Sequence, residues 1–152
     1  MSCSYYAYVL YGVKLDPAKF GVRTDKVRGC AHPEPAGKFC GDCGEPAWKT
    51  EEVPVLATAM QDFPEPPYRS EPDSTPQLLD VADWNDEAES RTHYVGMGLC
   101  VSAAGGLSAL RMDTLDQAEA LARVRASLAL RGLWTDSVAS TLGTWVVGRI
   151  SY

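Results

Sequence analysis

The chain has 152 residues, 45% of them hydrophobic, which is enough to bury the core of one ordinary domain, with or without a small added module. Its formal net charge of −6 argues against broad nucleic-acid binding, because phosphate backbones are bound by clustered Lys and Arg. No apolar run approaches the roughly 20 residues of a membrane-spanning helix. The first residues lack the basic and apolar regions of a signal peptide, so we expect a cytoplasmic protein.

The negative charge lies in the middle of the chain. Residues 1–50 carry seven Lys or Arg against five Asp or Glu, residues 51–91 carry two against eleven, and residues 92–152 carry five against four. Residues 61–77 also contain five Pro and show little periodicity, which is typical of an extended linker. We therefore expect 51–91 to be an acidic, Pro-rich connection.

The first predicted element is a β-strand at residues 5–15. This stretch is rich in aromatic and β-branched side chains and ends before Asp16-Pro17. Both of its faces are largely apolar, so we expect a central rather than an edge strand.

Four side chains with metal-binding donor atoms follow within fourteen residues, in Cys30-Ala31-His32 and in Cys40-Gly41-Asp42-Cys43-Gly44. The two-residue spacer lets the sulfurs of Cys40 and Cys43 face one metal, and Gly44 permits a tight reversal of the backbone beneath it. In a reducing compartment, clustered Cys mark a metal more often than a disulfide. The pattern predicts one structural zinc ion bound by Cys30, His32, Cys40 and Cys43.

The run Lys38-Phe39-Cys40-Gly41-Asp42-Cys43-Gly44-Glu45-Pro46 resembles the second half of a short zinc ribbon. The likeness covers about residues 28–48, and the first half departs from the family, which usually has two Cys separated by two residues. That departure leaves the identity of the fourth ligand open. The resemblance implies a structural metal without choosing an activity, since zinc ribbons serve nucleic-acid, protein and architectural roles.

A second resemblance concerns the layout of the N-terminal region. A Tyr-rich strand runs into Gly12-Val13-Lys14 and is followed by the compact Cys/His segment, an arrangement similar to small uncharacterised proteins of tailed phages. That resemblance implies a phage-encoded, non-catalytic protein that acts on a host protein in the host cytoplasm.

Two shorter elements are predicted before the last third of the chain. A strand is expected at 53–56, where Pro54 restricts it to a sheet edge. Residues 78–84 are expected to form a short helical turn within the acidic range.

The last third of the chain is predicted to be β-α-β. Residues 93–103 alternate bulky with small side chains, which indicates a strand with very close packing on one face. A helix is expected at 114–131, opened by a capping box at Thr114–Gln117 and ended by Gly132. Its predicted buried stripe is Leu115, Ala118, Leu121, Ala122, Val124 and Leu128. A final strand is expected at 143–152.

Together these elements predict an α+β fold. Residues 1–16 and 92–152 would form the core, a small mixed sheet with one covering helix, and the zinc ribbon at 17–50 would protrude as an insertion.

No catalytic constellation accompanies the Cys/His cluster. His93 is the only other His, and a surface or core role is expected for it. Two alternatives for the cluster stay open: unrelated buried side chains, or a redox Cys-x-x-Cys pair, which the lack of a preceding thioredoxin-like strand disfavours.

The expected function is therefore a non-catalytic, protein-binding or regulatory module. Its candidate contact is the acidic segment with Leu78, Leu79 and Trp84. The first alternative is nucleic-acid binding by the mildly basic segment 14–49, and the second is an uncharacterised zinc enzyme. No membrane partner is expected.

Overall fold

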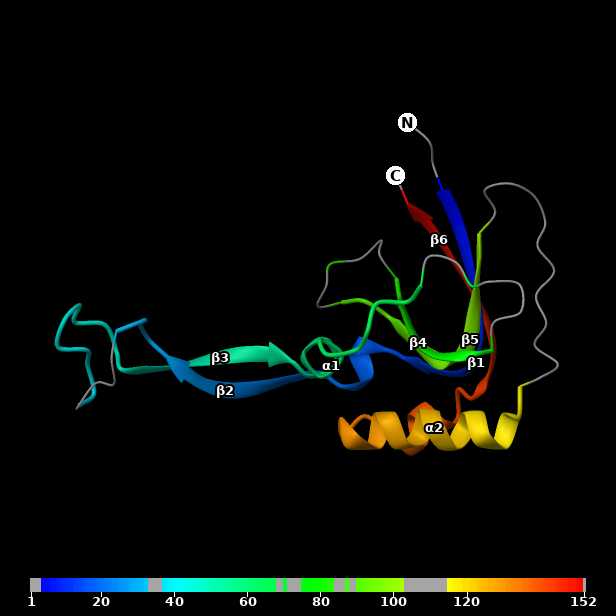
Figure 1. Ribbon diagram of the computed structural model, residues 1–152. Coiled ribbons are helices and arrows are strands. Elements are labelled where there is room, and N and C mark those ends of the chain that lie inside the picture. Colours follow the sequence, from blue (N-terminus) through cyan, green and yellow to red (C-terminus); the bar gives the residue numbers. More distant parts are fainter. Residues whose placement is uncertain are drawn as a thin grey trace.

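The computed structural model describes residues 4–32, 37–67, 70, 75–83, 87, 90–102 and 115–151. In chain order the elements are β1 (Ser4–Leu15), the 3₁₀ helix η1 (Pro17–Lys19), β2 (Val22–Arg28), β3 (Trp48–Pro54), α1 (Val55–Ala59), β4 (Gln77–Ala82), β5 (His93–Ser102), α2 (Gln117–Leu130), α3 (Asp136–Ala139) and β6 (Gly143–Ser151). A four-stranded sheet packs on helices, and a two-stranded sheet stands apart (Figure 1), which confirms the predicted α+β class. No helix in the described ranges is long and apolar enough to cross a membrane.

The larger sheet has the strand order β4-β5-β1-β6, so β1 is central as predicted. All of its pairings are antiparallel, which differs from the mixed sheet expected from the sequence. The apolar composition of β1 explains its place, because Tyr8 and Leu10 are fully buried on one face and Val13 and Leu15 on the other. The strands predicted at 5–15, 93–103 and 143–152 correspond to β1, β5 and β6.

The fourth strand, β4, forms where the sequence predicted a helical turn, so that prediction is wrong. Leu79 and Val81 are buried, whereas Leu78 and Asp80, which alternate with them, are half-buried. This period-two alternation lets the strand pair along its whole length with β5, and a helical turn would break it. The range 51–91 therefore contributes one strand to the sheet.

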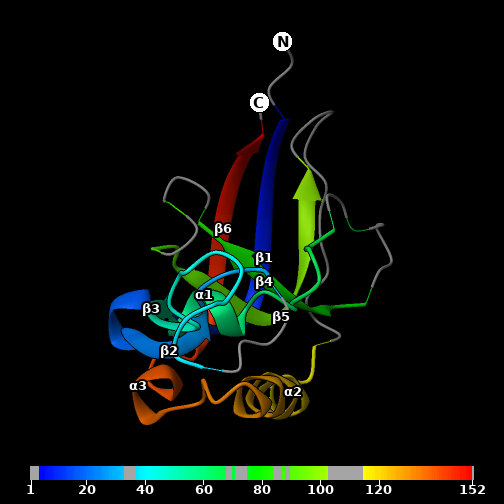
Figure 2. The ribbon, with the colours of Figure 1, turned by 90° about the vertical axis from the view of Figure 1, so that its left-hand side faces the viewer.

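α2 covers one face of the sheet, and α3 lies beside it on the same side (Figure 2). Asp116 caps the N-terminus of α2 by accepting hydrogen bonds from the backbone N–H groups of Ala118 and Glu119, at 2.9 and 3.2 Å. Thr114, the predicted first residue of the capping box, lies outside the described residues. At the other end Gly132 adopts a φ of 69°, and Leu133 N–H bonds to Leu128 O at 2.9 Å, which confirms the predicted C-terminal cap.

The buried stripe of α2 is shifted from the predicted one. Val124 and Leu128 are buried as expected, but Ala120 joins them while Ala118 and Ala122 are exposed. These residues pack with side chains of β1, β5, α1 and α3 in the main core. Among the described residues, the buried members of this core are Val13, Leu15, Leu56, Met60, Phe63, Val95, Met97, Ala120, Val124, Leu128, Leu133 and Val138.

The opposite face of the sheet holds a second, smaller core of Tyr8, Leu10, Leu79, Val81 and Cys100. Leu10 packs directly on the glycines of β5, because a side chain at Gly96 or Gly98 would meet Leu10 at 2.6 Å. The predicted close packing on the small-residue face of β5 is therefore confirmed. Trp145 adds to this face, and its Nε1–H donates to the Gly12 carbonyl at 3.2 Å.

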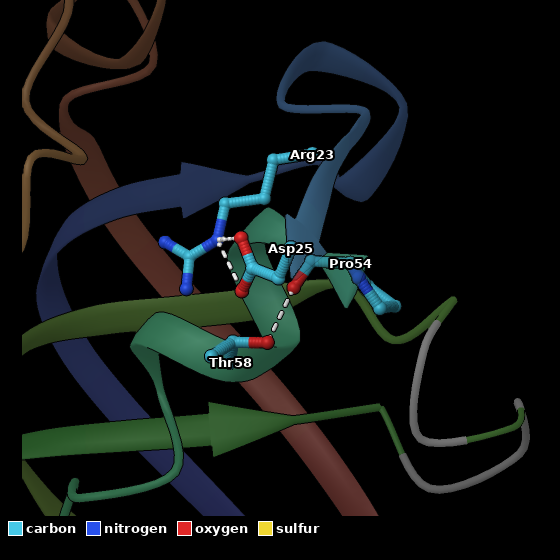
Figure 3. A network of polar contacts seen from close by, with 4 residues as sticks. All are labelled: Arg23, Asp25, Pro54 and Thr58. Carbon is cyan, nitrogen blue, oxygen red and sulfur yellow. Dashed lines mark hydrogen bonds and ion pairs between the residues drawn. The ribbon is translucent and has the colours of Figure 1, made fainter. Parts of the chain in front are cut away.

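β2 and β3 form a two-stranded hairpin that projects from the sheet and helices (Figure 1). At its base the Val55 N–H bonds to Gly21 O at 3.1 Å, and Leu56 of α1 inserts into the main core. Thr58 Oγ1 donates to Pro54 O at 2.7 Å at the start of α1, next to an Arg23–Asp25 ion pair on β2 (Figure 3). The strand predicted at 53–56 is confirmed at Val53 and Pro54, which end β3, and is wrong for Val55 and Leu56, which begin α1.

Candidate metal centre

The predicted metal ligands meet at the far end of the hairpin. Cys30 and His32 follow β2, whereas Cys40 and Cys43 precede β3. Their donor atoms all lie within 4.8 Å of one another. A tetrahedral zinc ion with Zn–S bonds of about 2.3 Å holds its sulfur ligands roughly 3.8 Å apart, so a slight contraction of this cluster would enclose a metal. The structure thus brings together all four residues that the sequence nominated.

Backbone hydrogen bonds continue the hairpin ladder beyond β2 and β3 and position the ligands. Gly29 N–H bonds to Ala47 O at 3.1 Å, and Ala47 N–H bonds to Lys38 O at 2.8 Å. A side chain at Gly29 would collide with the Pro46 carbonyl, so only Gly allows the two segments to approach this closely. Cys30, the next residue, is thereby held against the loop that carries the other two cysteines.

The loop from Cys40 to Glu45 is a tight knuckle. Cys40 N–H bonds to Glu45 O at 2.8 Å, and Gly44 N–H bonds to Cys40 O at 2.9 Å. Gly44 has a φ of 73°, in the left-handed region that L side chains rarely adopt. This confirms the reversal that the sequence assigned to Gly44.

The environment of Cys40 favours the thiolate, which is the form that binds metal. Hydrogen bonds from the backbone N–H groups of Cys43 and Asp42 lower the pKa of Cys40 to about 7. At Cys43 the Glu45 N–H acts in the same direction, but partial desolvation of the sulfur and the neighbouring thiols Cys40 and Cys30 together raise the pKa of this residue. Two adjacent thiols with opposite pKa shifts are expected where several anionic sulfurs would share one small volume.

The four ligands differ in exposure. Cys40 is buried, Cys30 is half-buried, and His32 and Cys43 are exposed. Three thiols and one imidazole are sufficient to hold a metal ion in a four-coordinate site.

Two exposed aromatic side chains at this end of the hairpin were not identified from the sequence. Phe39, beside Cys40, is 62% exposed and Trp48, the first residue of β3, is 48% exposed. Lys26 Nζ lies 5.3 Å from the centroid of the Trp48 ring, and Arg28 pairs with Trp48 across the hairpin. Aromatic residues are expected to be buried, so the sequence offered no signal for their exposure.

Two of the three residues predicted to contact a partner, Leu78 and Leu79, are used for packing. Leu79 is buried in the second core and Leu78 packs against the main core. Trp84 lies outside the described residues, so a partner-binding role for this segment stays a prediction.

His93 lies in the core, as expected, and takes no part in the Cys cluster. Its Nδ1 is 2.9 and 3.0 Å from the two carboxylate oxygens of Asp80 on the adjacent strand β4. Both side chains are about 10% exposed. This pair could not be predicted from the sequence, because it depends on β4 lying beside β5.

No model of a known protein family matches the sequence, and no curated protein or solved structure matches it either. Compatibility with a zinc ribbon therefore rests on the geometry of the hairpin tip itself. The similarity to tailed-phage proteins stays a prediction.

Proposed function

We propose that this chain is a non-catalytic zinc-binding protein whose metal site orders a hairpin tip for binding a partner protein. The observation that carries the proposal is the convergence of four donor atoms within 4.8 Å at the end of a projecting hairpin. Thiolate and imidazole donors suit zinc, which accepts tetrahedral geometry without a preference of its own.

A structural role for the metal is favoured over a catalytic one by the number of ligands. Catalytic zinc keeps an open position for water beside three protein ligands, whereas structural zinc is closed by four. Cys30, His32, Cys40 and Cys43 supply four.

The partner-binding surface in this proposal is the tip face, which we define as Lys26, Arg28, Phe39 and Trp48. Phe39 forms a backbone bridge with Pro46, and Trp48 is paired within the hairpin ladder, so each aromatic residue is held in place with its side chain in water. Aromatic and Arg side chains are enriched in protein interfaces and supply most of their binding energy. A phage origin, as the second resemblance implies, would make the partner a host protein.

Elemental analysis of the purified protein tests the metal assignment. We expect one zinc per chain, lost in a Cys40→Ser/Cys43→Ser double variant and retained in a Cys3→Ser control, which changes a cysteine outside the ligand set. Zinc bound at full stoichiometry by the double variant would contradict the assignment.

Affinity capture from a host lysate tests the binding role. A Phe39→Ala/Trp48→Ala variant should bind zinc normally and lose the captured protein, whereas a Val22→Ala control, at another exposed position of the hairpin, should keep it. Equal capture by both variants would remove the tip face from the proposal.

Nucleic-acid binding is a second candidate, favoured by one observation. Lys26 lies over the exposed Trp48 ring and Arg28 is the cross-strand partner of Trp48, and such a combination can stack a base while contacting its phosphate. The whole range 22–54 opposes it, with five Lys or Arg against six Asp or Glu. Titration with single-stranded DNA and RNA at increasing salt separates the candidates, because phosphate binding weakens steeply as salt rises.

A further inference from the structure

β6 is an outer strand of the larger sheet with one side paired. It pairs with β1 from Gly143 to Ser151, and no other described strand pairs with it. Figure 2 shows β6 beside β1 at the margin of the sheet. Val146 in its middle is 71% exposed, and the neighbouring Thr144 and Gly148 are exposed as well.

The other outer strands carry protection against pairing with a second chain. Natural proteins protect free edges by keeping them short, by charges, by Pro and by inward-pointing charged side chains. β4 has six residues, follows Pro76 and turns Asp80 inward. The hairpin strands are strongly charged, with Arg23, Asp25, Lys26 and Arg28 on β2 and Lys49, Glu51 and Glu52 on β3, which ends at Pro54.

Of these protective features, β6 has only a single charged residue. Its nine residues, Gly143 to Ser151, include no Pro, no Asp and no Glu, and Arg149 is the single charged residue. The adjacent β1 carries only Lys14 among charged types. β4, the strand that the acidic range 51–91 contributes, lies at the opposite margin of the sheet.

We propose that β6 pairs with β6 of a second copy of this chain, giving a two-fold symmetric dimer in which the two larger sheets become continuous. Antiparallel pairing of a strand with itself satisfies two-fold symmetry, since the same surface serves both partners. The direction also continues the antiparallel pairing of the sheet.

The sequence of β6 is complementary to itself in this arrangement. Pairing centred on Val147, the middle residue of the strand, places Val146 opposite the partner subunit's Gly148, so a large residue meets a small one. The same register places Arg149 opposite the partner subunit's Trp145 and keeps the two arginines apart. Like charges therefore do not meet across the contact.

Sedimentation equilibrium of the zinc-loaded 152-residue chain over a wide concentration range tests the dimer. We expect the wild type to form a dimer and Val146→Lys to raise its dissociation constant at least about tenfold, because a charge on an exposed edge opposes strand addition. Val22→Lys is the matched control, since it places the same side chain at another exposed valine of a different strand, and it should dimerise like the wild type.

Thr144→Lys, on the same exposed face of β6, gives a second reading if Val146→Lys unfolds. A wild type that stays monomeric throughout, or a dimer that persists unchanged in both β6 variants, would overturn the proposal. Because β6 belongs to the larger sheet, the dimer should persist in the Cys40→Ser/Cys43→Ser variant.

Discussion

The larger sheet with its helices, which we call the body, and the hairpin of β2 and β3 are stabilised in different ways. In the body, side chains such as Val13, Leu15, Val124 and Leu128 are completely removed from water. In β2 and β3 no side chain is buried. Apolar burial is therefore available to stabilise the body. An isolated two-stranded hairpin is only marginally stable in water, so the hairpin depends on its anchor at the base and on the Cys/His cluster at its tip.

The largest expected effect is the loss of cooperative folding of the body. Val124→Asp should abolish cooperative folding, because it places an unpaired charge at a fully buried position between α2 and the sheet. Arg125→Asp, at the next and exposed position of the helix, is the control and should melt close to the wild type. Thermal unfolding followed by circular dichroism measures both, and a Val124→Asp melting curve like that of the parent would show that the core is misassigned.

Removal of the metal should affect the hairpin and spare the body. A metal bound at the proposed site would stabilise chiefly the segment that its ligands enclose, so chelation should increase amide hydrogen exchange at Cys40, Gly44 and Ala47. Amides of β5 that pair with β1 should exchange as slowly as before. Global unfolding on chelation would mean that the body is not stable without the metal-bound hairpin.

A smaller effect is expected from a substitution beside the Cys/His cluster of the hairpin. Gly29→Ala should weaken zinc affinity by about tenfold or more, because its new methyl group would collide with the Pro46 carbonyl and force the ligand-bearing segments apart. Gly41→Ala, where a methyl group meets nothing within 4 Å, should bind zinc like the wild type. Competition with a zinc-binding dye measures both affinities, and equal values would remove the close approach from the explanation.

The parts predicted well from the sequence depend on local patterns. The Cys/His spacing brings donor atoms together over a few residues, and β1 has an apolar composition that suits a central strand. The helical turn at 78–84 failed because pairing with β5 decides the structure of β4. The stripe of α2 was shifted because Ala is small enough to lie on either side of the helix, and the sheet selects Ala120.

Features that depend on contacts between residues far apart in the chain could not be predicted from the sequence, for the same physical reason. The contact of His93 with Asp80 exists only because their strands are neighbours in the sheet. The exposure of Phe39 and Trp48 depends on the hairpin projecting away from anything that would cover them.

The close packing of β1 on β5 has a consequence for recognising distant relatives. A side chain at Gly12 would collide with the Val95 carbonyl, one at Gly98 with the Val9 carbonyl, and one at Gly96 would lie 2.6 Å from the Tyr11 carbonyl. Backbone atoms cannot swing aside as side chains can, so substitution at these positions requires the two strands to separate. Homologues that diverge over most of their length should still keep these three glycines in register, together with the spacing of Cys30, His32, Cys40 and Cys43.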